Sequence, residues 1–293
     1  MINLVRFYKR KMFMMNFKEL RKAQHITLTD ASKGICSVPM LSRWENGQGN
    51  MDLHKAIKLF ERINVTTSEY IALNKLDMPD NEAQELESAW HTQNEQELKI
   101  IAQKSLAKFH QDNKLFSLDY AALSCALYQR ISKINIFPVA DQNKLNKQLS
   151  KLTIWSQENL SLFQNVTNIL SPSIIFQISS QVIANFDFIN KAGKNTLHFA
   201  ITTLFEAIIS LLKASEFKYA QSILNKINLV ILPENEMQLI MGRYFLNSLM
   251  TYLENQNDQE ILQIITLLTK LNMKHMASYF LEIFNSLKAN LIA

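Results

Sequence analysis

The sequence predicts an all-α protein made of a small N-terminal domain of short helices and a larger C-terminal domain of longer ones. The first observation is a shortage of glycine. The 293 residues include five, where average usage would give roughly 20. The second is that apolar residues recur about every three to four positions, the period of a helix. The third is charge: residues 1–75 hold 13 Lys and Arg against 6 Asp and Glu, a net +7, and the remainder holds 18 against 20, a net −2.

The scarcity of glycine also excludes several classes of function. Gly47 and Gly49 form the only close pair of glycines, and they lack the Lys-Ser/Thr or the third Gly that nucleotide-binding loops require. Tightly turned β folds use glycine at positive φ, whereas a helix interior avoids it. A basic N-terminal segment favours a polyanion such as nucleic acid as the partner.

Two isolated cysteines, Cys36 and Cys125, form neither a disulfide framework nor a Cys-x-x-Cys motif, which predicts a reducing compartment. Residues 1–16 form a basic N-terminal arm without the continuous apolar stretch of a signal peptide. No window reaches the roughly 18 uninterrupted apolar residues of a membrane span. We therefore expect a cytoplasmic protein that makes no contact with a membrane.

No pattern of catalytic or metal-binding residues stands out. The six histidines are scattered without a His-x-x-x-His or His-Glu-x-x-His spacing, and no Gly-x-Ser-x-Gly segment occurs. The acidic pairs Glu85/Glu87 and Glu95/Glu97 are two positions apart, which puts them on different faces of a helix. We expect no catalytic residue, no metal and no cofactor, and thus not an enzyme.

The N-terminal domain, residues 17–75, is predicted to contain five short helices. The first covers 17–23. Thr27 is an N-cap for a second helix that reaches about residue 33, and Gly34 suits the turn that follows. Ser37 is the next N-cap, with Pro39 in the first turn of a helix over 38–46, where its missing N–H costs nothing. Gly47 ends that helix.

The fourth helix is expected to bury a stripe made of Leu53, Ile57, Phe60 and Ile63. Thr66 then caps a fifth helix over 67–73. Within the third helix, Leu41 and Trp44 are three positions apart and are expected to pack against the first two helices.

Four segments carry a resemblance to a known family: FKELRK (17–22), ITLTDA (26–31), SVPMLSRWENG (37–47) and INVTTSEYI (63–71). Together they resemble the XRE/Cro-like helix-turn-helix domain over residues 17–73. The run LSRWENG is similar to the LSRFERG segment of the Rgg/MutR transcriptional regulators of Gram-positive bacteria. The resemblance implies a homodimeric, DNA-binding regulator of transcription.

In a helix-turn-helix, the N-terminal part of the second helix of the motif meets base edges in the major groove. Arg43 could donate two hydrogen bonds to guanine, and Val38 and Met40 could contact thymine methyl groups. Helix N-termini at Thr27 and Ser37 offer N–H groups to phosphates. The predicted contacts with double-stranded DNA are Thr27, Lys33, Ser37, Val38, Pro39, Met40, Ser42 and Arg43.

One position departs from the family pattern and two match it. Leu28 stands where relatives often carry a Gln that grips a phosphate, so that contact would shift to residues such as Lys33. Arg21 and Glu45 stand where the fold commonly has an internal ion pair, and we assign them to structure rather than to DNA recognition.

The C-terminal domain, residues 76–293, shows helix after helix. Helical spacing is clear in three stretches, around residues 98–109, 217–227 and 276–287. The expected breaks fall at 113–114, 137–138, 171–172, 191–193, 233 and 255–258. Intervals of roughly 20 to 40 residues between breaks fit helical hairpins stacked as a TPR-like repeat.

Trp155 followed by LFQN (162–165), and GRYFL (242–246), are similar to stretches of Rgg-like C-terminal domains. The resemblance implies a concave surface that binds a short signalling peptide, a quorum-sensing pheromone, in a domain that also dimerises. An Asn amide can both donate to and accept from a peptide backbone. The expected peptide contacts are Asn165, Asn168, Asn195, Arg243 and Tyr244.

Two alternatives stay open at the level of sequence. The repeat domain could sequester a protein partner while the helix-turn-helix is vestigial. The chain could also be an Rgg-like regulator that has no peptide ligand.

Overall fold

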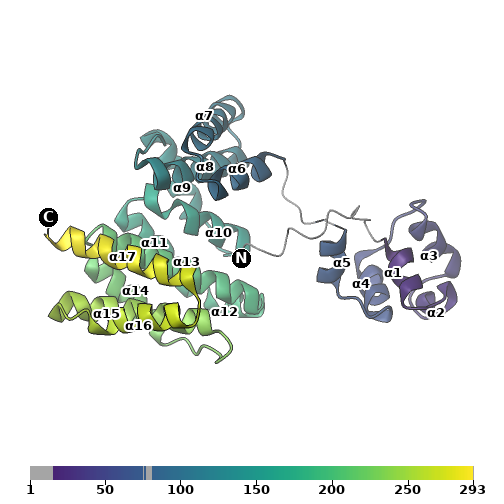
Figure 1. The fold of residues 1–293 in the computed structure, drawn as a ribbon. Coiled ribbons are helices and arrows are strands. Elements are labelled where there is room, and N and C mark those ends of the chain that lie inside the picture. The colour runs from purple at the N-terminus through teal and green to yellow at the C-terminus, as the bar shows by residue number, and fades with distance from the viewer. Residues whose placement is uncertain (1–15, 75, 77–80, 293) are drawn as a thin grey trace. The chain divides into compact units, whose positions relative to one another are not determined.

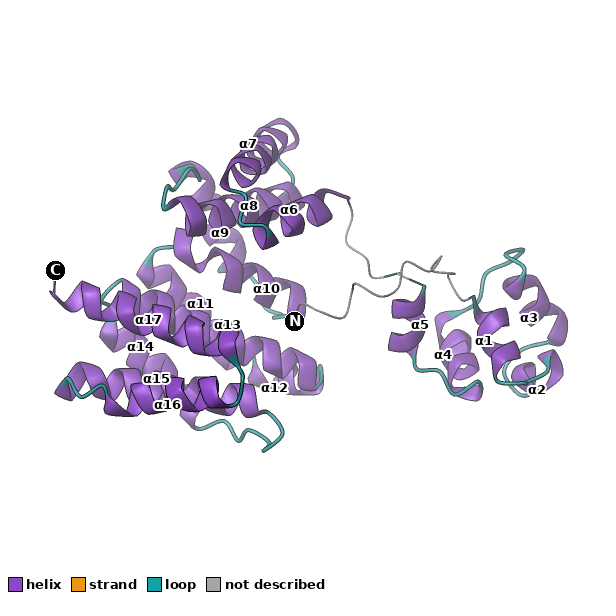
Figure 2. Ribbon diagram, in the orientation of Figure 1, coloured by secondary structure: helices purple, strands orange, loops and turns teal. Residues whose placement is uncertain are grey.

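The computed structural model describes residues 16–74, 76 and 81–292, and every described element of regular structure is helical. Two compact units are present, Met1–Gln84 and Glu85–Ala293. The all-α prediction with short helices first and longer ones after is confirmed (Figures 1 and 2). The boundary that we predict at 75/76 lies beside residues outside the described set. Of the basic arm predicted over residues 1–16, all but Asn16 lie outside that set, and both stay predictions.

The first unit contains α1 (Phe17–Ala23), α2 (Leu28–Ser32), α3 (Val38–Glu45), α4 (Leu53–Arg62) and α5 (Thr67–Leu73). All five of these helices begin at side-chain caps, and at α4 the cap is Asp52, which accepts from the Lys55 N–H. Asn16 and Thr66 each form a reciprocal capping box with a Glu three positions on, and Thr27 and Ser37 accept from the N–H three positions on. Each such cap satisfies one or two of the N–H groups that a helix start leaves unpaired.

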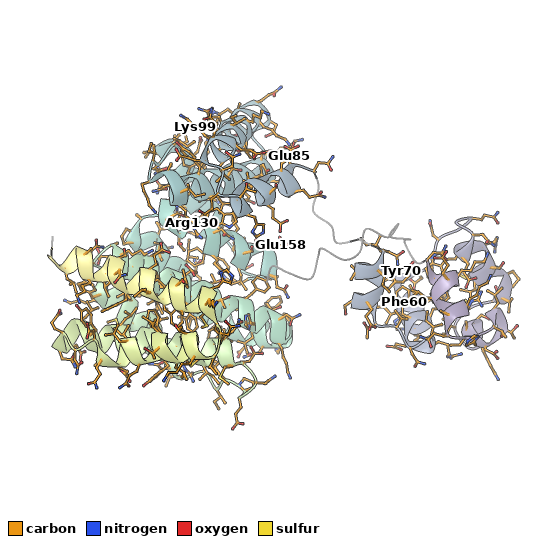
Figure 3. All side chains as sticks on the ribbon, in the orientation of Figure 1. Phe60, Tyr70, Glu85, Lys99, Arg130 and Glu158 are labelled. Atoms are coloured by element: carbon orange, nitrogen blue, oxygen red, sulfur yellow. The ribbon has the colours of Figure 1, made fainter. Side chains whose placement is uncertain are left out.

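Aromatic rings fill the core of this unit. The Phe17 ring lies 5.1 Å from that of Trp44, and the Phe60 ring stacks on Tyr70 at 4.2 Å (Figure 3). Leu41 is fully buried, as predicted.

The predicted stripe on α4 is wrong at one position. Leu53 is 70% exposed and Ile57 is half-buried, while the buried face is made of Ala56, Leu59, Phe60 and Ile63. With Ile63 pointing inward, ten residues at 3.6 per turn rotate Leu53 about 80° away from the core.

The second unit begins within α6, at Glu85, and continues to α17. Its elements are α6 (Asn81–His91), α7 (Glu95–Asp112), α8 (Leu115–Ser132), α9 (Val139–Leu149), α10 (Gln157–Val166), the 3₁₀ turn η1 (Thr167–Ile169), α11 (Pro172–Ala184), α12 (Phe186–Lys191), α13 (Lys194–Lys213), α14 (Phe217–Asn228), α15 (Met237–Asn255), α16 (Gln259–Lys270) and α17 (Lys274–Ile292). Helices that are neighbours in the chain pack as hairpins, such as α7 with α8, α13 with α14, and α16 with α17. All six predicted breaks fall between helices or include the terminal residue of a helix.

Helix α13 lies at the centre of this unit and packs against α10, α11, α12, α14, α15 and α17 (Figure 1). In the described part of the chain it is the one helix long and apolar enough to cross a membrane by length and composition. It is mostly buried within the unit, with residues such as Ala200, Leu204 and Ile208 fully covered. Its apolar composition is accounted for by its place in the protein core.

Candidate DNA-binding surface and repeat-domain pocket

The N-terminal end of α3 is exposed to solvent on one face, while the opposite face of the same helix packs into the core of the unit. The Met40 N–H donates to Ser37 Oγ at 3.3 Å, which fixes the first turn, and Pro39 lies within that turn. Leu41 is buried and Trp44 packs on Phe17. The side chains left outward include all the α3 residues that the sequence assigns to DNA: Ser37, Val38, Pro39 and Arg43 are exposed, and Met40 and Ser42 are half-buried.

Helix α2 lies beside α3 and carries the other two predicted contacts. The Asp30 N–H donates to Thr27 Oγ1 at 3.1 Å, while the Thr27 hydroxyl donates to the Asp30 carboxylate. Lys33 is the C-cap of α2 and is exposed. Gly34 has φ +75°, a conformation that favours glycine, and it makes the turn toward α3. All eight predicted DNA contacts thus lie on α2, on α3 or at their caps.

A buried ion pair holds α1 against the end of α3. Arg21 donates from Nε and Nη2 to the two carboxylate oxygens of Glu45 at 2.7 and 2.8 Å, and from Nη1 to the Ile26 carbonyl at 2.7 Å. The side chains are 6% and 1% exposed. The hydrogen bonds to Glu45 raise the pKa of Arg21. The predicted ion pair is confirmed, and it holds α3 against α1.

One residue that holds α2 in place could not be predicted from the sequence. Arg62, at the end of α4, donates from Nη1 to the Asp30 carbonyl at 2.7 Å and so ties α4 to α2 across 32 residues. A charged residue at an exposed helix end ordinarily reads as solvated surface, so only the tertiary structure reveals this contact.

The five residues that the sequence assigns to a peptide are dispersed over α10, η1, α13 and α15. The amide of Asn165 donates to the Ser161 carbonyl, and that of Asn168 donates to the Ala126 carbonyl on α8. Arg243 Nη1 donates to the Val230 carbonyl at 2.7 Å and holds the loop after α14. The other two are exposed: Asn195 lies at the start of α13, and Tyr244 donates to the Glu260 carboxylate.

A pocket of about 250 Å³ lies between α10, α13, α15 and α17. Its walls are mainly apolar and include Phe205, Ile209, Leu239 and Phe280. Glu206 and Tyr279 add polar groups, and the Tyr279 hydroxyl donates to the Glu206 carboxylate. Burial and that carboxylate raise the pKa of the Tyr279 phenol, so the hydroxyl keeps its proton. None of the five predicted peptide residues lines this pocket, although Gln164, which precedes Asn165, does.

A second hollow of about 420 Å³ lies between α8 and α10 and contains Asp119 and Glu158. Gln148 Nε2 donates to Asp119 at 2.8 Å. Burial nevertheless raises the pKa of Asp119 to about 6, with the Gln148 hydrogen bond acting in the opposite direction.

The raised pKa of Asp119 predicts a pH-dependent stability. Between pH of about 4, where the carboxyl ionises in the unfolded chain, and about 6, the folded state binds more protons, so the free energy of unfolding falls as pH rises. Above a pH of about 6, Asp119 is ionised in both states and the free energy of unfolding no longer falls because of this group. Asp119→Asn should therefore stabilise the second unit by about 1–2 kcal/mol at pH 7 and by almost nothing at pH 4. Calorimetry of both proteins across this range would contradict the prediction if their stability curves ran parallel.

The described residues contain no group of three or more His, Cys, Asp or Glu that could hold a metal ion. Cys125 is buried, and burial raises the pKa of its thiol to about 12. A smaller polar cluster is centred on Asp141, whose two carboxylate oxygens lie 2.6 Å from His110 Nε2 and 3.1 Å from Lys144 Nζ. It ties α7 to α9.

Comparison with known proteins gives two family matches. Residues 87–282 match the C-terminal domain of the HTH-type transcriptional regulator Rgg, and residues 17–70 match a helix-turn-helix family. The first match covers more than half of the chain.

Solved structures show the same fold over nearly the whole length. The SHP pheromone receptor Rgg2 of Streptococcus dysgalactiae is 11% identical, with a TM-score of 0.74 over 93% of this chain and 98% of that one. PrgX in complex with cCF10 is 14% identical, with a TM-score of 0.71 over 95% and 92%. A regulator structure from Listeria monocytogenes EGD-e is 12% identical, with a TM-score of 0.73 over 95% and 98%.

Proposed function

The chain belongs to the Rgg family of helix-turn-helix transcriptional regulators, and we propose that it acts as a homodimer that reads a two-fold DNA site and responds to a short peptide. This family comprises regulators of transcription and not enzymes. The observation that carries the DNA-binding proposal is the N-terminal part of α3. There Ser37, Val38, Pro39 and Arg43 face solvent, and the helix is anchored by Leu41, Trp44 and Glu45.

Recognition of bases would come from α3. Arg43 is exposed and can donate two parallel hydrogen bonds to guanine O6 and N7. Val38 and Met40 offer apolar contacts to thymine methyl groups, and Ser42 can bond a base or a phosphate. Thr27, Lys33 and the N-terminal turn at Ser37 and Pro39 would hold the phosphate backbone, which sets register without reading sequence.

A two-fold site follows from the proposed homodimer. Two copies of α3 related by a two-fold axis would enter successive major grooves about one helical turn of DNA apart. A ligand that changes the arrangement of the two copies would change the spacing between these helices, and so the affinity for DNA.

The proposed site of action is the cytoplasm.

The proposed ligand is a short peptide in the repeat domain. The support is the fold shared with Rgg2 and with PrgX, the first solved as a pheromone receptor and the second in complex with cCF10, together with the apolar pocket on α13. Asn165, Asn168, Asn195, Arg243 and Tyr244 remain proposed contacts. In this proposal Asn165 uses its side-chain oxygen, because its amide nitrogen donates to Ser161.

The test of DNA binding is a titration of the full chain against duplexes that cover its own promoter, at about 50 and 200 mM salt. Each phosphate neutralised by a Lys or Arg adds about 0.9 to the slope of log affinity against log salt. Lys33→Ala is expected to weaken binding to all sequences alike and to reduce the slope by about one. Lys99→Ala, an exposed change on α7, is the matched control. A wild-type chain that binds no duplex at low salt would overturn the proposal.

The test of peptide control uses synthetic peptides encoded by short reading frames beside the gene. At least one is expected to shift the DNA affinity or the sedimentation of the chain. No shift with any of them would favour a regulator without a peptide ligand.

A further inference from the structure

We infer that the pocket between α10, α13, α15 and α17 binds the amino-terminal residue of a peptide, with a bulky apolar side chain in the pocket and the terminal ammonium on Glu206. The inference rests on the proposed function, because it names the part of a peptide that the second unit recognises. Three observations carry it: the size of the pocket, a glycine in its wall, and an acidic group beside it whose printed hydrogen bond comes from a neutral hydroxyl.

The pocket has the size of a side chain. Its volume of about 250 Å³ lies below the roughly 300–1,000 Å³ of sites that enclose a complete small molecule. Phe205, Ile209, Leu246 and Phe280 give it an apolar lining. One aromatic or branched aliphatic side chain fits inside it, while the rest of the ligand lies outside.

Gly242 belongs to the wall of this pocket. It lies inside α15, where glycine costs about 1 kcal/mol relative to alanine and where no positive φ calls for it. A Cβ atom at this position would lie 2.8 Å from Cε2 of Phe205. The glycine therefore lets the Phe205 ring lie directly against the α15 backbone, and this close approach shapes the apolar pocket.

Glu206 provides a negative charge next to that apolar surface. It is half-buried, and in the described part of the chain no Lys or Arg forms an ion pair with it. Its bonded partner is the Tyr279 hydroxyl, a neutral donor from an element 73 residues away. Arg130 is near enough for its charge to lower the pKa of Tyr279, but its guanidinium donates to the Gln164 and Asn165 carbonyls. A carboxylate with two oxygens, of which one accepts from Tyr279, has capacity for a further donor. A charged donor makes the stronger hydrogen bond.

The spacing on α13 distinguishes a terminal ammonium from other cations. Glu206 adjoins Phe205 and is one turn from Ile209, so the carboxylate and the apolar lining are within about 5–6 Å of each other. In the first residue of a peptide, the ammonium and the side chain share one Cα atom. A lysine ammonium lies at the end of its own four-carbon stem, so a bulky apolar side chain in the pocket would have to come from a second residue.

The test measures binding of three probes to the full chain by ¹⁹F NMR. The first is 4-fluoro-L-phenylalaninamide, which has a free α-ammonium. The second is its N-acetyl derivative, and the third is N-acetyl-4-fluorophenylalanyl-lysinamide, in which the only ammonium is that of a lysine. Titration into the millimolar range at constant salt is needed for such small ligands. The free-amine probe is expected to bind at least about ten-fold more tightly than either of the others, a difference near 1.4 kcal/mol.

Two variants separate the charge from the cavity. Glu206→Gln keeps the shape of the side chain, and it should remove the ten-fold preference while leaving the acetylated probe unchanged. Gly242→Ala moves the Phe205 ring, and it should weaken all three probes. Glu254→Gln, on the exposed face of α15, is the matched control for the loss of one acidic group. Circular dichroism verifies that each variant is folded.

The inference is overturned if no probe binds, if the acetylated probe binds as well as the free amine, or if the preference survives Glu206→Gln. Equal binding of the lysine probe overturns the assignment to a peptide terminus. None of these results touches DNA binding. If a peptide shifts the DNA affinity of the chain but the probes give one of the contradicting results above, only this inference is refuted. If the free-amine probe binds as expected but no peptide shifts the DNA affinity, the proposed peptide control is refuted.

Discussion

Replacing Glu45 with alanine is expected to lower the free energy of unfolding of the first unit by about 3–5 kcal/mol, the cost of leaving one member of a buried ion pair without its partner. Arg21 would keep one hydrogen bond to the Ile26 carbonyl, and its charge would stay in a site where 6% of the side chain is exposed. Domains are stable by only about 5–15 kcal/mol, so this loss threatens the unit as a whole.

Hydrogen exchange of the backbone amides in α1 and α3, measured on the full chain, reports the free energy of unfolding of the first unit separately from that of the second. Glu61→Ala, an exposed change on α4, should shift the same amides by no more than about 0.5 kcal/mol. Replacing both partners, Arg21→Met with Glu45→Leu, should recover most of the stability, because no charge is then left buried. Equal effects of Glu45→Ala and Glu61→Ala would show that the ion pair does not hold α3 in place.

Arg43→Ala should reduce affinity for the preferred DNA site by about 1–3 kcal/mol, or roughly 5- to 150-fold, because a bidentate contact with guanine is lost. Binding to unrelated DNA at low salt should fall much less, since one positive charge contributes only a share of the phosphate term. The two effects together would lower the specificity ratio. Fluorescence anisotropy on matched and scrambled duplexes measures that ratio.

Lys99→Ala changes the net charge by the same amount from an exposed position on α7, and it should leave the specificity ratio unchanged. If Arg43→Ala weakened matched and scrambled duplexes equally, Arg43 would be a phosphate contact and base recognition would lie elsewhere.

The first unit could be predicted closely because its determinants are local. Thr27 and Ser37 each cap a helix through an N–H three residues away, and Gly34 takes the left-handed conformation of the intervening turn. Such signals lie within a few residues of the element that they define. The prediction that Leu53 is buried is wrong because apolar character alone does not give the direction in which a side chain leaves a helix.

The helix ends of the second unit are harder to predict, and their chemistry gives the reason. Several of them use a residue other than glycine at positive φ, among them Asn113, Ser215, Gln256 and Asn272. Asn tolerates that conformation, whereas the others are held there by their surroundings. The boundaries near 215 and 272 therefore carry no glycine or proline, and this use of other residues helps explain how so long a helical chain contains so few glycines.

The pocket could not be predicted from the sequence because it is assembled from distant elements. Glu206 and Tyr279 meet across 73 residues, and Phe205 meets Gly242 between two helices. Asn168 and Arg243 stand out in the sequence as polar residues within apolar stretches, and in the structure they donate to backbone carbonyls of α8 and of the loop after α14.

The most direct test of a DNA-reading regulator is selection of duplexes by the full chain from a random pool, followed by sequencing, at about 150 mM salt. The account predicts an enriched motif made of two inverted half-sites about 10 base pairs apart, with a guanine in each half-site whose enrichment disappears in Arg43→Ala. A pool without any enriched motif, or a motif that Arg43→Ala leaves unchanged, would contradict the assignment of base recognition to α3.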